Sequence, residues 1–463
     1  MAPYNLLSPT SYLFIQLKTI VIFIVILFSS CVNNDGISSP EIVEISISQE
    51  YPLIYRINIV LDEPSPVFIR YRNETGPLME ITSENRATTH SLILSRLTAD
   101  ARYSVRIYAG NNIYTEEIIT EPLPDDLAAI EFETTGIASY PLTLMKLYYE
   151  NGYQGYGIIN NEGNIVWYYR TEGRASGATR RANGNFVFID FGIGLIEVDP
   201  AGRIVASLPH EAVGGTIHHD VITTPSDRLW FIAQNTQETT DGKIIGEAIW
   251  EWIPETGQTN KLWSSFDHLD PAVDWGPRSQ EENWLHVNAL SIGPRENVII
   301  SSHFLNQIIS IAPDFQSIEW RLGGVNATIE VDENERFSGQ HTPSENKPGH
   351  ILLFDNGFER GVFSRAVEFR IEGDQAQKMW EFRPEQDNWA QIISSARRLE
   401  NENTFICFGL SEEASRGAGA IEVYEVGPDG AVEWYMKAGG SIWAMYRASP
   451  VETIAGERDV SDN

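Results

Sequence analysis

The feature that most constrains the fold of this 463-residue sequence is a strand–turn–strand unit that recurs from about Ile130 onward. Each copy has an apolar strand, a turn that carries Asp, Gly or Pro, and a second strand that often ends in tryptophan. The six copies are 157–167, 196–205, 250–263, 309–320, 367–380 and 423–434. Repeats of roughly forty to sixty residues, built from short antiparallel strands, are typical of a β-propeller with one copy per blade.

The way in which the two ends of this repeat region fit together predicts six blades. The first hairpin lacks a leading strand, whereas the last strand-like segment, 442–448, lacks a hairpin. Joining them completes the ring and removes its open edges. We therefore predict a six-bladed β-propeller over residues 130–450, with the recurring tryptophans packed between blades. In the other five copies a strand precedes the hairpin, at 177–181, 218–224, 286–292, 340–344 and 394–399.

A different pattern precedes the repeats. Residues 39–124 alternate apolar and polar side chains in short strands separated by turns, which is typical of a small β-sandwich. The segment from Leu97 to Tyr103 resembles the corner before the sixth strand of a fibronectin type III domain, in which a leucine and a tyrosine anchor the loop. The predicted fold class is all-β: a small fibronectin type III-like β-sandwich followed by the six-bladed propeller.

The sequence predicts a signal peptide at the N-terminal end and a disordered tail at the C-terminal end. The apolar run 19–28 is too short to cross a bilayer comfortably and is typical of a secretory signal. Two serines before Cys31 resemble the end of a bacterial lipoprotein signal peptide covering residues 1–31. We expect secretion across the inner membrane and a lipid anchor on Cys31 in the cell envelope, with a noncleaved anchor as the alternative. The acidic, aperiodic tail 451–463 is predicted to be disordered.

The charge of the chain limits its partners. A formal net charge of -31, with no clustered basic segment, argues against nucleic acid as a partner because nothing is present to neutralise phosphates. An anionic substrate would have to be attracted by local positive charge.

Histidines mark the start of several repeat units, although the chain has only nine. They lie in 217–220 (IHHD), 285–288 (LHVN) and 339–342 (GQHT). The first strand of each blade lines the central channel, with alternate side chains pointing into it. These imidazoles are therefore expected to meet near one mouth of the channel. They could hold a divalent metal, or one could attack an electrophile while the others act as acid, base and anion clamp.

Several short motifs lie in and around the stretch 286–357. They are 284–289 (WLHVNA), 298–302 (VIISS), 319–324 (EWRLGG), 340–341 (QH) and 353–357 (LFDNG), together with 217–220. With these motifs the stretch resembles the core of the bacterial arylsulfate sulfotransferases. The resemblance implies that a sulfuryl group moves from an aryl sulfate to a phenol through a sulfohistidine, without a nucleotide donor. It implies neither a cofactor nor a metal.

The resemblance also implies roles for individual residues. The sulfate-accepting nucleophile matches His341, and the other catalytic histidines match His286 and the pair His218 and His219, of which strand alternation favours His219. The residues predicted to bind substrate are Asn288, which lies beside His286 in the resemblance, and His303 and Thr342, which the resemblance itself does not supply.

The sequence departs from the family after the Ser301-Ser302 pair, where His303 stands in place of the usual arginine. A histidine donates to a sulfate oxygen only through a protonated nitrogen, and it lacks the two-pronged grip of a guanidinium. Candidate substitutes are Arg365, Arg397 and Arg398. Two other functions stay open: a noncatalytic propeller that binds a ligand or protein, and a metal-dependent hydrolase or lyase that uses the same histidines.

Overall fold

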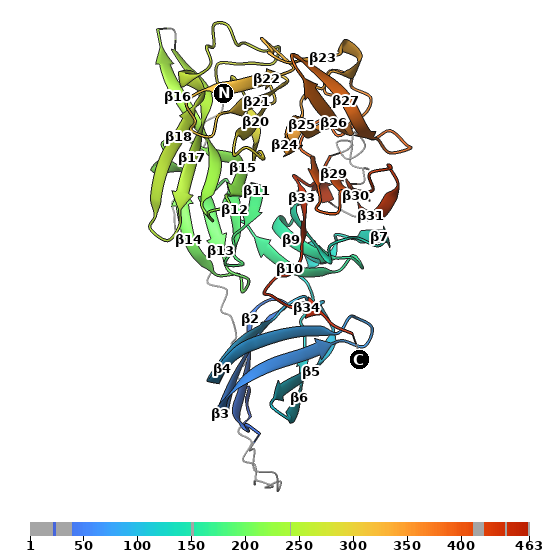
Figure 1. Ribbon diagram of the computed structural model, residues 1–463. Helices are drawn as coiled ribbons and strands as arrows, with labels where there is room; N and C mark the ends of the chain where they lie inside the picture. Colours follow the sequence, from blue (N-terminus) through green and yellow to red (C-terminus); the bar gives the residue numbers. More distant parts are fainter. Residues whose placement is uncertain are drawn as a thin grey trace, which may run out of the picture.

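The chain folds into two β domains in the computed structural model, and Figure 1 shows the larger domain above the smaller one. The structure describes residues 22–24, 39–149, 152–240, 242–410, 421–439 and 442–461. Within these ranges no helix is long and apolar enough to span a membrane. The helical segments are α1 (Asp125–Ala128), η1 (His210–Ala212), η2 (Ser265–Asp267) and η3 (Glu333–Glu335).

The larger domain is a ring of antiparallel sheets, each of which forms one blade (Figure 1). The first blade contains β8 (Leu142–Tyr149), β9 (Gln154–Asn160), β10 (Ile165–Arg170), β32 (Ile442–Ala444) and β33 (Ala448–Val451). The second contains β11 (Ala175–Arg180), β12 (Phe186–Asp190), β13 (Gly194–Val198) and β14 (Ile204–Pro209). The third contains β15 (Ile217–Thr223), β16 (Leu229–Thr239), β17 (Gly242–Ile253) and β18 (Gln258–Ser264).

The remaining three blades complete the ring. The fourth contains β19 (Val287–Ile292), β20 (Val298–Ser302), β21 (Gln307–Ile311) and β22 (Ile318–Leu322). The fifth contains β24 (His341–Lys347), β25 (His350–Asp355), β26 (Arg365–Glu372), β27 (Gln375–Phe382) and the short parallel strand β23 (Glu330–Val331). The sixth contains β28 (Ser395–Arg398), β29 (Thr404–Phe408), β30 (Ile421–Val426), β31 (Val432–Ala438) and β7 (Phe132–Gly136).

Both ends of the propeller sequence close the ring. The late strands β32 and β33 pair antiparallel with β8 of the first blade. The early strand β7 pairs antiparallel with β31 of the last blade. Because each end supplies a strand to a blade formed by the other, the ring has no open seam. The predicted six-bladed, all-β fold is confirmed.

Apolar side chains fill the spaces between neighbouring blades. One cluster joins the third and fourth blades through Ile249, Trp284 and Ile300, and another joins the sixth and first through Trp434 and Leu147. Trp167, Trp252, Trp284 and Trp434 are the largest fully buried side chains. The repeated tryptophans therefore pack between blades, where their large apolar area stabilises the ring.

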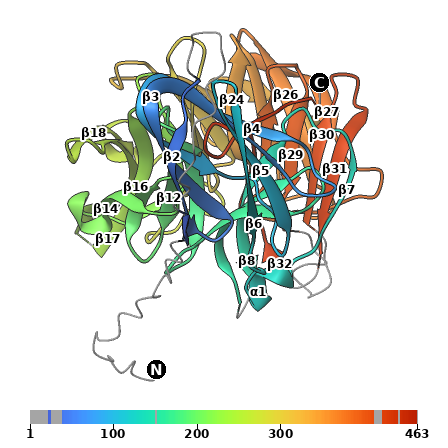
Figure 2. The same ribbon diagram turned by 90° about the horizontal axis from the view of Figure 1, so that it is seen from below.

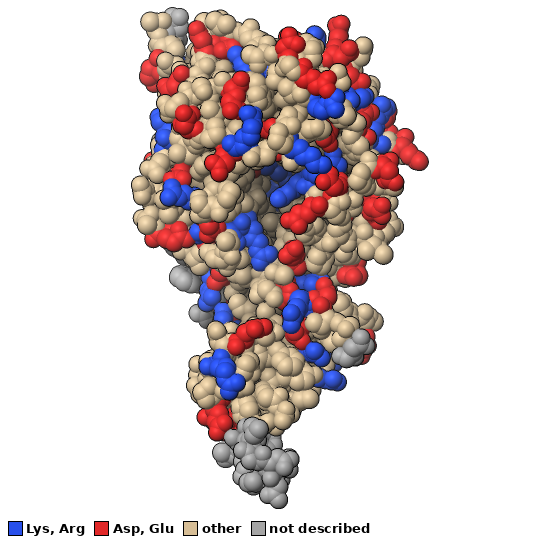
Figure 3. Space-filling model, viewed as in Figure 1, with Lys and Arg blue, Asp and Glu red and all other residues tan. Residues whose placement is uncertain are grey.

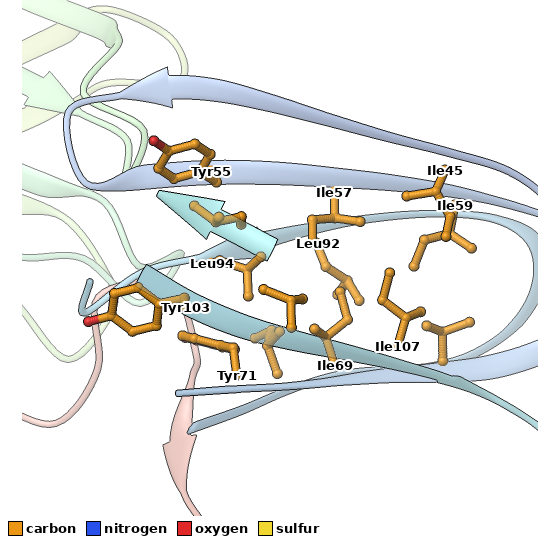
Figure 4. Close-up of a cluster of buried hydrophobic side chains, with 14 of the residues drawn as sticks. Ile45, Tyr55, Ile57, Ile59, Ile69, Tyr71, Leu92, Leu94, Tyr103 and Ile107 are labelled. Atoms are coloured by element: carbon orange, nitrogen blue, oxygen red, sulfur yellow. The ribbon is translucent and has the colours of Figure 1, made fainter. Parts of the chain in front are cut away.

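The smaller domain is a β-sandwich-like unit whose strands lie in front of the ring when seen from below (Figure 2). Figure 4 shows its core, in which Ile57, Ile69 and Ile107 point into one interior. Leu97 is buried, and the Tyr103 hydroxyl accepts a hydrogen bond from the Thr98 N–H at 2.9 Å. A leucine and a tyrosine thus anchor this loop, while the fibronectin type III assignment stays a prediction. Its strands are β1 (Ile22–Ile24), β2 (Ile42–Tyr51), β3 (Ile54–Arg72), β4 (Met79–Leu94), β5 (Arg102–Ala109), β6 (Asn112–Ile119) and β34 (Arg458–Asp459).

The predicted signal peptide falls almost entirely outside the described residues. Of residues 1–31 the structure describes only β1, and Cys31 lies outside. Cleavage and lipid anchoring stay predictions.

The C-terminal tail is ordered against both domains, so the prediction of a disordered tail is wrong for residues 451–461. Ile454 and Glu457 are both 0% exposed. The Ser95 hydroxyl of the sandwich donates to Glu457 Oε2 at 2.7 Å, and Arg180 of the second blade donates to the Ile454 carbonyl at 2.9 Å. The polar groups of the tail are thus satisfied by both domains, which local sequence periodicity does not reveal.

We expect Glu457→Ala to destabilise the protein. The carboxylate also accepts the N–H groups of Ile454 and Ala455, each at 2.7 Å, so its loss leaves buried donors without partners. The expected fall in the free energy of unfolding is about 1–3 kcal/mol, measured by urea denaturation. Glu452→Ala, at an exposed position of the same tail, is the matched control. Equal stability of the two variants would show that the buried carboxylate of Glu457 does not stabilise the packing of the tail against the two domains.

Candidate active site

The histidines singled out in the sequence lie where three consecutive inner strands begin. His218 and His219 belong to β15, His286 immediately precedes β19, and His341 opens β24. Each of these strands has an irregular register near its start. The backbone is left-handed at His219 (φ 59°) and His286 (φ 51°). Such local distortions redirect side chains and are common next to active sites.

Five imidazole rings form a continuous cluster. The ring centroids of His218 and His219 are 4.8 Å apart, and those of His219 and His286 are 4.6 Å apart. His286 lies 5.1 Å from His303, which lies 5.5 Å from His341. The structure therefore brings together all the histidines named in the sequence analysis, across three blades. Among the described residues, no group of three His, Cys, Asp or Glu side chains is placed to hold a metal ion.

Burial keeps these imidazoles neutral. Desolvation lowers the pKa of His218 and of His341 to about 3, and that of His286 to about 4. The pKa values of His219 and His303 also lie well below the ordinary value, mainly because of burial and then because of neighbouring imidazoles. A neutral imidazole keeps one free lone pair, which is the form that acts as a nucleophile or base.

The hydrogen bonds of His341 determine which of its nitrogens carries the proton. Nδ1 lies 2.8 Å from Asn356 Oδ1 and 3.1 Å from the Gly339 carbonyl, and both of these atoms only accept. The Asn356 amide is itself oriented, because its Nδ2 donates to the carbonyls of Ala390 and Ile393 at 2.7 and 2.9 Å. Nδ1 is therefore protonated, and the lone pair is on Nε2.

The neutral ring of His286 carries its proton on the other nitrogen, Nε2. Asn283 Nδ2 lies 2.7 Å from His286 Nδ1, and an amide nitrogen only donates, so the proton of the neutral ring is on Nε2. His218 Nδ1 and His219 Nδ1 are 2.5 Å apart, so one ring donates to the other. His218 Nε2 has no hydrogen-bond partner in the described part of the chain.

The predicted substrate-binding residues Asn288 and Thr342 differ in which of their polar atoms are available to hydrogen-bond a ligand. Asn288 is 0% exposed and donates from Nδ2 to the Gln340 carbonyl at 2.9 Å, while its Oδ1 has no partner among the residues described. The Thr342 hydroxyl accepts the Ala396 N–H of the next blade at 3.0 Å, which leaves only its hydrogen to donate. The binding roles of both residues stay predictions.

Two arginines at the cluster were not expected from the sequence. Arg447 pairs with buried Asp220 and donates to the Asn288 carbonyl at 2.7 Å. Arg278 lies 3.0 Å from His303 through Nη1 and Nε2. Arg447 could have been found, because it lies at the end of the strand-like segment that closes the ring. Arg278 lies in a loop without a regular pattern.

The arginines proposed from sequence as substitutes are held elsewhere. Arg365 is buried against Asp355, Glu335 and Glu381. Arg398 pairs with Glu368, and Arg397 is exposed. Arg365 and Arg398 have their charge neutralised by these carboxylates.

A comparison with known proteins identifies the family. The family model for arylsulfotransferase (ASST) matches residues 133–447. The chain belongs to the arylsulfotransferase family. The family predicted from the motifs is thus confirmed.

Similarities to individual proteins are weaker. The arylsulfate sulfotransferase AssT of Escherichia coli is 24% identical over 214 residues, which cover 38% of this chain and 33% of that protein. The match thus spans about a third of the relative's length. A Bacteroides caccae protein of unknown function is 15% identical with a TM-score of 0.44, covering 68% of this chain and 100% of its own. Virginiamycin B lyase from Staphylococcus aureus is 14% identical with a TM-score of 0.35, covering 80% and 99%.

Acidic and basic side chains are mixed on the face of the protein shown in Figure 3. Figure 3 shows Asp and Glu side chains across the face in view, with Lys and Arg side chains interspersed. Near the histidine cluster, Arg447 and Arg278 supply positive charge.

The buried histidines should make stability depend on pH. The folded-state pKa of His218 is lowered to about 3, so below pH 6.5 the unfolded chain takes up a proton that the folded chain does not. Stability is therefore lost as pH falls from about 6.5 toward 3. His218→Gln removes one such group, and we expect the slope of the unfolding free energy to decrease by up to about 1.4 kcal/mol per pH unit. Urea denaturation between pH 6 and 4 measures this; identical slopes would contradict it.

Proposed function

We propose that this protein transfers a sulfuryl group from a phenolic sulfate ester to a phenol, through a sulfohistidine intermediate on His341. The observation that carries the proposal is the fixed tautomer of His341: Nδ1 is held by Asn356 and Gly339, which leaves a neutral Nε2 lone pair. Membership of the arylsulfotransferase family supports the class of reaction.

In the first step, His341 Nε2 attacks the sulfur of the aryl sulfate. An N–S bond forms and the S–O bond to the aryl group breaks, with its electron pair leaving on the phenolate oxygen. The phenolate is a stable leaving group because its charge spreads into the ring. The sulfurylated imidazole retains its Nδ1 proton, and Asn356 and Gly339 accept from it.

In the second step, the hydroxyl oxygen of an acceptor phenol attacks the same sulfur. The N–S bond breaks and its electron pair returns to His341 Nε2. The phenol proton passes to a neighbouring imidazole and then to the first phenolate, so that the charges balance. We assign this base role to His219, whose Nδ1 lies 2.5 Å from His218 Nδ1, which leaves Nε2 free when His219 donates.

The other predicted residues would stabilise the transferring group. His286, protonated on Nε2, can donate to a sulfate oxygen or to the departing phenolate oxygen. Asn288, His303 and Thr342 would complete the binding site. The reaction needs neither a cofactor nor a metal. Secretion and a lipid anchor at Cys31 in the bacterial envelope belong to the same proposal and rest on the sequence.

We expect para-nitrophenyl sulfate to leave a sulfuryl adduct on His341. Incubation without an acceptor should add one sulfuryl group to the intact protein and release about one equivalent of nitrophenol in a burst. Mass spectrometry of peptides would locate the adduct on His341, and His341→Asn should abolish it.

The control for this experiment is His268→Asn, because His268 stacks on Trp263 outside the cluster. This variant should retain the adduct. A native fold with neither adduct nor transfer would contradict the proposal and favour a noncatalytic ligand-binding propeller. An adduct that persists in His341→Asn would assign the nucleophile to another residue.

We expect Asn356→Ala to slow transfer about tenfold to a hundredfold through kcat, with little change in KM, because the tautomer of His341 is no longer enforced. Asn346→Ala, at an exposed position on the same blade, is the control. Steady-state kinetics beside thermal melting would separate this effect from loss of the fold. Unchanged kcat in a folded Asn356→Ala protein would show that Asn356 does not position His341.

A further inference from the structure

The five buried imidazoles of the cluster carry no positive charge of their own. Burial keeps all five imidazoles neutral, whereas an aryl sulfate carries a negative charge that must be stabilised in a buried site. Among the described residues, the charged donors that contact the cluster or its immediate neighbours are the guanidinium groups of Arg447 and Arg278.

The charge of Arg447 is already compensated. Its guanidinium forms an ion pair with Asp220, whose side chain is 4% exposed. Asp220 also accepts the Leu290 N–H at 2.9 Å, so the carboxylate is held in place. A buried ion pair contributes little net charge to a nearby ligand.

Arg278, in contrast, has no ion pair among the described residues. Its guanidinium lies over the rings of Phe304 and Phe358, at 5.5 and 4.2 Å from their centroids. Nη2 donates to the His303 carbonyl at 2.5 Å and to Asn306 Oδ1 at 3.1 Å. Nε has no hydrogen-bond partner in the part of the chain described. The aromatic rings and the two uncharged acceptors hold the guanidinium in place. Glu359, which accepts from Asn306 Nδ2, acts on this charge from beyond ion-pair distance.

Arg278 also determines how His303 is protonated. Arg278 Nη1 lies 3.0 Å from His303 Nε2, and a guanidinium only donates, so Nε2 accepts and the proton of the neutral ring is on Nδ1. His303 is 4% exposed, and its Nδ1 has no hydrogen-bond partner among the described residues. Burial is the main cause that lowers the pKa of this ring, and the Gly339 backbone acts in the opposite direction. A buried N–H without an acceptor costs free energy that a ligand oxygen would recover.

We propose that Arg278 and His303 act together as an anion clamp that holds the sulfate oxygens of the donor beside His341. The Arg278 guanidinium supplies the positive charge and fixes the His303 tautomer, and His303 Nδ1–H donates to a sulfate oxygen. The ring of His303 lies 5.5 Å from that of His341, centroid to centroid, which is close enough for one sulfuryl group to contact both. This assignment rests on the proposed function and names the group that binds its donor.

The test compares equilibrium binding of para-nitrophenyl sulfate and para-nitrophenol, by isothermal titration calorimetry, in the wild type, Arg278→Ala and Arg278→Lys. We expect Arg278→Ala to weaken binding of the sulfate ester roughly tenfold to a hundredfold, because a charged hydrogen bond is lost, and to leave phenol binding nearly unchanged. Lysine should restore part of the affinity, because it keeps the charge but loses the planar contacts.

Arg170→Ala is the matched control, because Arg170 also lies over an aromatic ring, that of Tyr153 at 4.7 Å, but pairs with Asp126. It should bind the ester as the wild type does. A second measurement, nitrogen-15 NMR of the histidines, should show that the Nδ1-protonated form of His303 is lost in Arg278→Ala.

Two results would overturn the clamp: unchanged ester affinity in a folded Arg278→Ala protein, or an equal loss of ester and phenol affinity. Failure of the proposed function is distinguishable, because these binding measurements require no transfer. If no adduct forms on His341 while ester binding depends on Arg278, the clamp stands and the transfer reaction does not.

Discussion

The pairing of both ends of the propeller sequence into one ring is the constraint on which the rest of the structure depends. Strands β32 and β33 complete the first blade, and β7 completes the last. Closure packs the inner strands of neighbouring blades against one another, as β15 lies against β19 and β19 against β24, so residues far apart in sequence become neighbours. The same C-terminal segment then continues to the smaller domain, where Glu457 is buried. Ring closure and domain docking are therefore physically linked.

The second organising effect is desolvation. Burying five imidazoles together lowers their pKa values and removes their charge, which suits nucleophilic attack but leaves an anionic substrate without a cation. Two different side chains meet these needs: His341 supplies a neutral lone pair, and Arg278, which forms no direct ion pair among the described residues, places a positive charge next to His303. Polar atoms of His218, His303 and Asn288 have no hydrogen-bond partner within the described part of the chain, and a ligand that bonded to them would recover free energy lost on burial.

Repetition explains why much of the fold could be predicted. The strand–turn–strand unit and its tryptophans predict where each blade lies in the sequence, because each blade buries the same kind of surface. The convergence of His219, His286 and His341 followed from the same repeat. The order of the tail at 451–461 could not be predicted, because it depends on Ser95 and Arg180, which are far away in sequence. The ion pairs of Arg365 and Arg398, which were candidate substitutes for the family arginine, could not be predicted either, because their carboxylate partners are apparent only in the folded chain.

The sequence by itself determined the all-β propeller, the number of blades, the family and the identity of the clustered histidines. Only the tertiary structure decided which nitrogen of His341 is free and which arginine keeps its charge. The physical reason is that tautomers and charge compensation depend on contacts of about 3 Å between blades and loops. A linear pattern specifies which residues reach the channel, but not which atoms meet there.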